Sequence, residues 1–107
     1  MNRIGFLLKV KEDMIDDYKE KHKEVWPELL KALNETGWHN YSIFMRSNGE
    51  LFGYFETPDS LQTAIAKMGS KEINAKWQKM MAPYFEIPAG NHADEMMLEL
   101  EEVFHLD

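Results

Sequence analysis

The sequence predicts an α+β domain in which a four-stranded antiparallel sheet carries its helices on one face. Stretches in which apolar side chains alternate every two residues, and stretches with a helical repeat, follow one another in the order strand, helix, strand, strand, helix, strand. The two middle strands are joined by Ser47-Asn48-Gly49, a tight-turn sequence that makes them antiparallel neighbours. This is the order of the split βαβ arrangement, in which the helices cover a single face of the sheet.

The composition fits one domain that spans residues 1–107. Hydrophobic residues make up 44% of the chain and charged residues 29%, which indicates an ordinary globular protein. The net charge of −7 argues against nucleic acid and anionic membrane surfaces as partners. The chain has no cysteine, so it offers no disulfide, thiol nucleophile or thiolate metal ligand, and we expect it in the cytoplasm. The apolar stretch within residues 1–10 is too short, and too often interrupted by polar residues, for a signal peptide or a membrane span.

The first strand is predicted over residues 3–10. One of its two faces is entirely apolar and must be buried: Ile4, Phe6, Leu8 and Val10. Asp13 is the expected N-cap of the helix that follows. The amphipathic repeat carries this helix through His22 to about Val25.

A break is predicted at Trp26-Pro27, because a proline in an unbroken helix would bend it and restricts the residue before it. A second helical segment starts at Pro27, which is a favoured residue in the first turn of a helix. This segment runs to Thr36, and Gly37 is its expected C-cap.

The middle strands are predicted over residues 38–45 and 50–56. In the first, one face carries His39, Tyr41, Ile43 and Met45, and the other carries Trp38, Asn40, Ser42 and Phe44. In the second, Leu51, Gly53 and Phe55 face one way, and Phe52 and Tyr54 face the other.

The remaining chain is predicted to hold helices over residues 59–68 and 71–81, a loop over 82–95 and a last strand over 96–106. The loop is long for a domain of this size, and such loops often cover a site or reach a partner. His92 in this loop is expected at the surface.

Large apolar side chains occur on both faces of the predicted strands, among them Leu7, Phe44, Tyr54 and Phe104. They cannot all point toward a single helix layer. Two copies that pack sheet against sheet would cover the second face, so we expect a homodimer of the dimeric α+β barrel type. The alternative is a monomer with one sheet face in water, which suits strands with a cleaner polar alternation.

Chemistry is expected where Tyr18 and His22 lie one helical turn apart on the inward face. An imidazole exchanges protons near neutral pH, and a phenol can bind a hydroxyl. Tyr41 meets both if its strand face lies under the helices, and Trp77 could stack on a sugar ring. Each of these residues has a structural alternative, as core or cross-strand packing. The pattern suits an uncharged polyhydroxylated ligand and proton transfer better than hydrolysis.

Other kinds of site find no support in the sequence. No helix carries His-x-x-His or Glu-x-x-His spacing, so no metal site is predicted, and His105 is expected at the surface. There is also no glycine-rich phosphate loop.

The chain resembles the L-rhamnose mutarotases over nearly its whole length. The residues that carry the resemblance are Tyr18, His22, Trp26-Pro27-Glu28-Leu29, His39-Asn40-Tyr41-Ser42-Ile43, Trp77 and the ending Leu100-Glu101-Glu102-Val103-Phe104-His105-Leu106. The resemblance implies a ferredoxin-like dimer, an isomerase that interconverts the α and β anomers of L-rhamnose in the cytoplasm without a cofactor. By position, it implies that His22 is the proton donor and that Tyr18 and Tyr41 contact the sugar.

One position departs from the family pattern of two adjacent tryptophans in the third helical region. The matching pair is Lys76-Trp77. Lys76 is expected either to donate a hydrogen bond to a sugar hydroxyl or to point to solvent. Two other classes stay open: a cofactorless or haem-related monooxygenase of the dimeric α+β barrel type, and a non-catalytic sugar-binding module.

The expected reaction opens the sugar ring. His22 would give a proton to the ring oxygen and take it back after the aldehyde has rotated. A neighbouring tyrosine or an ordered water would handle the anomeric proton.

Overall fold

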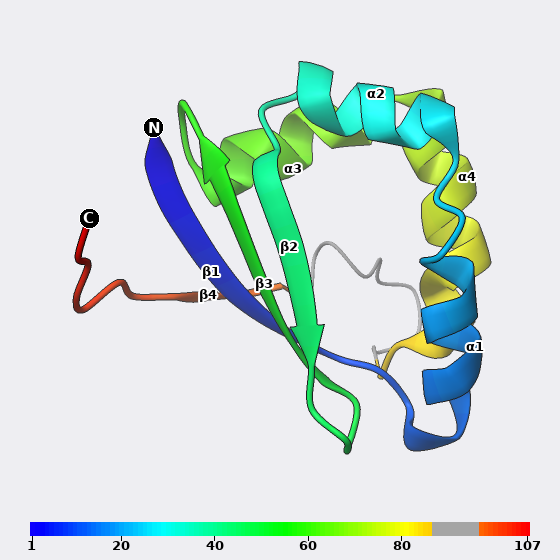
Figure 1. Cartoon of the computed structure of the whole chain (residues 1–107). Helices are drawn as coiled ribbons and strands as arrows, with labels where there is room; N and C mark the ends of the chain where they lie inside the picture. The colour runs from blue at the N-terminus through cyan, green and yellow to red at the C-terminus, as the bar shows by residue number, and fades with distance from the viewer. Residues whose placement is uncertain (87–96) are drawn as a thin grey trace.

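The computed structural model describes residues 1–86 and 97–107, and it has a sheet with its helices on one side (Figure 1). Four antiparallel strands lie in the order β2-β3-β1-β4. The strands are β1 (Asn2–Lys9), β2 (His39–Met45), β3 (Glu50–Thr57) and β4 (Leu98–Leu100). The helices are α1 (Ile15–Lys21), α2 (Pro27–Glu35), α3 (Leu61–Gly69) and α4 (Glu72–Met81). The predicted α+β class and one-sided helix layer are confirmed.

The alternation in β1 and β3 places their apolar faces under the helices, as predicted. The buried side chains of these strands are Ile4, Phe6, Leu51 and Phe55, and Val10 just after β1 is buried as well, whereas Leu8 is only half-buried. The ring of Phe6 lies over Gly53, its partner across the two strands, where any Cβ would collide with the ring. The glycine therefore lets a large aromatic side chain lie close to the backbone of the sheet.

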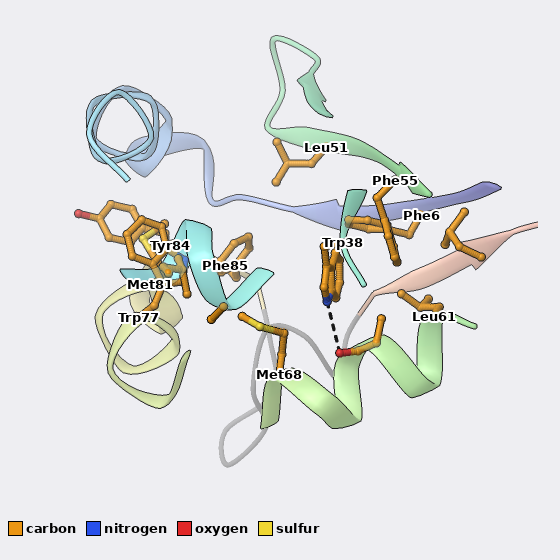
Figure 2. Packing of buried hydrophobic residues seen from close by; sticks show 14 of the residues in the cluster. Phe6, Trp38, Leu51, Phe55, Leu61, Met68, Trp77, Met81, Tyr84 and Phe85 are labelled. Carbon is orange, nitrogen blue, oxygen red and sulfur yellow. Dashed lines mark hydrogen bonds between the residues drawn. The ribbon is translucent and has the colours of Figure 1, made fainter. Parts of the chain in front are cut away.

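Trp38 joins the sheet to the helix layer, in contrast to the prediction that it faces away from Tyr41 (Figure 2). Its ring stacks on Phe55 with centroids 4.1 Å apart, and its Nε1–H donates a hydrogen bond of 3.3 Å to the Ala64 carbonyl in α3. The reason is an irregularity in the register of β2 between residues 39 and 42, where Asn40 has a φ of 48°. This bulge shifts the alternation, so Trp38 and Tyr41 both point toward the core, with ring centroids 5.2 Å apart.

The first helix is shorter than predicted. A 3₁₀ turn over Glu12–Met14 precedes α1, so Asp13 is not the N-cap, and α1 ends at Lys21 rather than near Val25. The break predicted at Trp26-Pro27 is present, but it does not explain why α1 ends as early as Lys21. Trp26, the residue before the proline, is extended, with φ −58° and ψ 132°, and the chain must leave the helix before that residue.

The predicted hairpin turn is confirmed, with Gly49 after Asn48. The predicted end of α2 is one residue too late, since α2 ends at Glu35 and its C-cap is Thr36, not Gly37. Gly37 and Gly49 each have a φ of 94° that favours glycine. Ser60 accepts a hydrogen bond from the Thr63 amide and caps α3. In the part of the chain that the structure describes, no helix is long and apolar enough to cross a membrane.

The last strand is much shorter than the predicted span of 96–106, since β4 covers only Leu98–Leu100. β4 runs antiparallel to β1 and pairs Leu100 with Gly5. The residues that follow Leu100 therefore reach the first residue of β1 after a few positions. An ion pair between Arg3 and Glu102, 2.8 Å long, lies in this stretch. The residues beyond it have no strand left to pair with, and they are exposed without regular structure.

The predicted loop over 82–95 begins with structure that the sequence did not indicate. A 3₁₀ turn covers Ala82–Tyr84, and Phe85 pairs with Val10. Tyr84 and Phe85 are buried in the core (Figure 2). The amide of Glu86 donates a hydrogen bond of 3.0 Å to the Lys9 carbonyl, and residues 87–95 of the predicted loop, with His92, lie outside the described residues.

The sheet face away from the helices carries an apolar row across all four strands. Cross-strand pairs join Phe44 to Phe52, Phe52 to Leu7, and Leu7 to Leu98. The rings of Phe44 and Phe52 stack with centroids 6.4 Å apart. Phe44 is 61% exposed and Leu98 63%. We call these four residues the outer row.

Candidate active site

A cavity of about 470 Å³ lies between the helix layer and the sheet. This volume is in the range of small-molecule sites. Four of the five side chains predicted to form a site line it: Tyr18, His22, Tyr41 and Trp77. They come from α1, the residue that ends α1, β2 and α4, so the fold brings together residues far apart in the sequence.

The early end of α1 places His22 in the wall of the cavity. Its amide closes the last turn on the Tyr18 carbonyl at 3.2 Å. Its ring stacks on Tyr18 with centroids 4.2 Å apart, and it meets the Trp77 ring edge-on at 5.5 Å. Trp26 contacts Trp77 in the same edge-on manner at 5.1 Å. The imidazole is therefore held on two sides by aromatic rings.

The hydrogen bond of the His22 ring determines which nitrogen can react. Nδ1 lies 3.0 Å from the Tyr18 carbonyl oxygen, which can only accept, so the proton of the neutral ring is on Nδ1. Nε2 then carries a free lone pair. Burial lowers the pKa of His22, and the hydrogen bond to the carbonyl offsets part of this change. At neutral pH the ring is therefore uncharged and Nε2 is ready to accept a proton.

The two phenols keep their protons. Burial raises the pKa of both Tyr18 and Tyr41, and the charge that Tyr18 would carry raises the pKa of Tyr41 further. Among residues 1–86 and 97–107, neither hydroxyl is hydrogen-bonded to another protein group. Both can therefore donate a hydrogen bond to a ligand in the cavity.

Sequence reasoning missed two uncharged polar residues of the cavity wall, Asn74 and Gln78, and two lysines that also line it, Lys19 and Lys23. A signal for the two amides was present, because they lie three residues before and one residue after Trp77, and Asn74 and Gln78 are four apart. On a helix, this spacing puts both amides on the face that carries the indole. The prediction considered Lys76, the direct neighbour of Trp77 in the sequence, instead.

Lys76 is the one predicted site residue that the structure does not bring to the cavity. Its side chain is exposed on α4 and is not among the lining residues. Of the two expectations for Lys76, a bond to a sugar hydroxyl or a side chain that points to solvent, the exposed position suits the second. We expect Lys76→Ala to change the affinity for L-rhamnose by less than about twofold, because surface substitutions that contact no ligand have small effects. Titration of both proteins with L-rhamnose by NMR measures this, and a tenfold loss of affinity would restore the role expected from the sequence.

Comparisons with known proteins agree on one family. A family model described as L-rhamnose mutarotase matches residues 3–106. L-rhamnose mutarotases of Oceanobacillus iheyensis and Bacillus subtilis are 39% and 35% identical, each over 100% of both chains. The crystal structure of an L-rhamnose mutarotase from Formosa agariphila superposes with a TM-score of 0.81 at 28% identity and covers 100% of both chains. The chain belongs to the L-rhamnose mutarotase family.

Proposed function

We propose that this protein interconverts the α and β anomers of L-rhamnose, as an isomerase that acts by opening and closing the sugar ring. The observation that carries the proposal is an uncharged imidazole with a free Nε2 in a cavity that also presents two phenols and an indole. These groups suit acid–base chemistry on a neutral polyhydroxylated ring. The names of the relatives support L-rhamnose as the substrate.

In the proposed reaction, His22 Nε2 first takes the proton of the anomeric hydroxyl. The electron pair of that O–H bond forms the carbonyl, the bond between the anomeric carbon and the ring oxygen breaks, and the ring oxygen takes a proton. Because both oxygens are bonded to the same carbon, the imidazolium can give its new proton to the ring oxygen. Rotation about the bond to the aldehyde carbon and the reverse transfers then produce the other anomer.

This sequence of steps keeps His22 as the donor to the ring oxygen, as the family resemblance implies, and it also assigns the anomeric proton to the same nitrogen. Tyr18 and Tyr41 would position the sugar by hydrogen bonds, since their raised pKa makes them poor proton donors. Trp77 would pack against an apolar face of the ring. No further group is needed to balance the protons.

The proposal includes a homodimer that forms through the sheet face and closes a dimeric α+β barrel. The outer row supports it, because contiguous exposed apolar side chains on a sheet are a typical subunit interface. Val103, Phe104 and Leu106 in the C-terminal segment are also more than three-quarters exposed. A cytoplasmic location belongs to the same proposal and is supported by the absence of cysteine from the sequence.

Saturation-transfer NMR on L-rhamnose tests the function. Irradiation of one anomeric proton should reduce the signal of the other in proportion to the concentration of protein. Binding of L-rhamnose without faster exchange would instead indicate a sugar-binding module. If the protein binds haem with a visible absorbance band and leaves anomer exchange unchanged, the haem-related alternative replaces the proposal.

A further inference from the structure

We propose that Asn74 and Gln78 recognise hydroxyl groups of the sugar and thereby determine which aldoses the cavity accepts. The inference rests on the proposed function and extends it, since it assigns substrate selection to the α4 wall of the cavity. His22 acts on the anomeric centre, which every aldose has. Selection among sugars must therefore come from groups that contact the other hydroxyls.

The placement of the two amides is the first support. Asn74, Trp77 and Gln78 all line the cavity from α4, at the i, i+3 and i+4 spacing of one helix face. Trp77 between them meets the ring of His22 edge-on at 5.5 Å. A sugar whose anomeric carbon lies at His22 is therefore within the same cavity as both amides.

The second support is the state of the amides without a ligand. Asn74 is only 6% exposed, and in the described part of the chain its side chain has no hydrogen-bond partner. The NH₂ group of Gln78 likewise has no hydrogen-bond partner among residues 1–86 and 97–107. Buried polar atoms without partners are rare in folded proteins because they lose their bonds to water and gain nothing in return.

The chemistry of the amide indicates the ligand. A carboxamide offers an oxygen that accepts and an NH₂ group that donates, and a sugar hydroxyl can do both in return. The Oε1 atom of Gln78 has no accessible surface, so Gln78 would bind one hydroxyl through its NH₂ group, and Asn74 would bind another. A site with buried amides discriminates against an analogue that lacks the matching hydroxyl, because the amide is then left unpaired.

The test replaces Gln78 with methionine, which has a similar length and cannot form these hydrogen bonds. Lys79→Met is the matched control, since Lys79 is the next residue on α4 and is exposed. L-rhamnose and its analogues deoxygenated at C2, C3 or C4 are titrated by NMR, and anomer exchange is measured at saturation. Gln78→Met should bind L-rhamnose about tenfold more weakly, the loss expected for one neutral hydrogen bond. Lys79→Met should leave both the affinity and the exchange at saturation unchanged, because its side chain lies outside the cavity.

The analogues identify the hydroxyl that Gln78 binds. One of the three should bind wild type and Gln78→Met with equal affinity, and the Lys79→Met variant should match the wild type throughout. If Gln78→Met does not fold, Asn74→Leu carries the same test at the neighbouring amide. Unchanged affinity in a folded Gln78→Met variant, or an equal loss for every analogue, would overturn the inference. Failure of the proposed function shows separately, as a wild type that does not accelerate anomer exchange.

Discussion

His22→Gln is expected to slow anomer exchange of L-rhamnose about 100- to 10,000-fold, the usual contribution of general acid–base catalysis. Glutamine fills much of the same space and can still donate to the Tyr18 carbonyl, but it cannot accept and return a proton at neutral pH. Because His22 is only half-buried, the variant should fold. It should also still bind the sugar, since Tyr18, Tyr41 and Trp77 stay in place.

The matched control is His39→Gln, the same exchange at a half-buried histidine of β2 that does not line the cavity. Exchange rates from saturation-transfer NMR, measured at saturating L-rhamnose, separate catalysis from binding. His39→Gln should keep the wild-type rate. If a folded His22→Gln protein binds L-rhamnose and exchanges its anomers as fast as the wild type, His22 is not the acid–base group.

The second large effect is expected at the outer row. Phe44→Asp combined with Phe52→Asp should raise the dimer dissociation constant at least about 100-fold, because burial of unpaired carboxylates in an apolar interface costs several kcal/mol. The two rings are neighbours on β2 and β3, so the double change removes the centre of the exposed apolar face. Sedimentation equilibrium over a range of protein concentrations measures the shift from dimer to monomer.

Ala66→Asp is the control for added charge, since Ala66 is exposed on α3, on the opposite side of the molecule from the outer row. That variant should remain as dimeric as the wild type. A wild-type protein that is monomeric at all concentrations, or an outer-row variant with unchanged dissociation, would show that the sheet face is not the interface.

The order of strands and helices along the chain and the buried faces of β1 and β3 could be predicted, because they follow from local alternation and helical repeats in the sequence. Positions at which the strand alternation is interrupted could not be predicted. The bulge near Asn40 turns Trp38 toward the core, and alternation alone does not reveal it. The length of β4 is limited by β1, the strand with which it pairs. The residues after Leu100 alternate like a strand, but the sequence does not show that β1 offers them no further partner.

The candidate site, too, could be predicted only in part. Tyr18, His22, Tyr41 and Trp77 were predicted from residue chemistry and family resemblance, and they line one cavity. The end of α1 was wrongly predicted because the amphipathic repeat continues to Val25, whereas the helix itself ends at Lys21. This early end is what brings His22 to the C-terminus of the helix, where its Nδ1 can reach the Tyr18 carbonyl.

The central claim is that an uncharged His22 exchanges protons with the sugar. The pH dependence of anomer exchange tests it most directly, together with an NMR titration of the His22 ring and with protein-free rates subtracted. Because burial lowers the pKa of His22 below its usual 6.5, exchange should be constant near neutral pH and should fall as the pH drops through the lowered value. The midpoint should coincide with the titration of His22. A rate that rises as the pH falls, or a midpoint unrelated to His22, would contradict the claim.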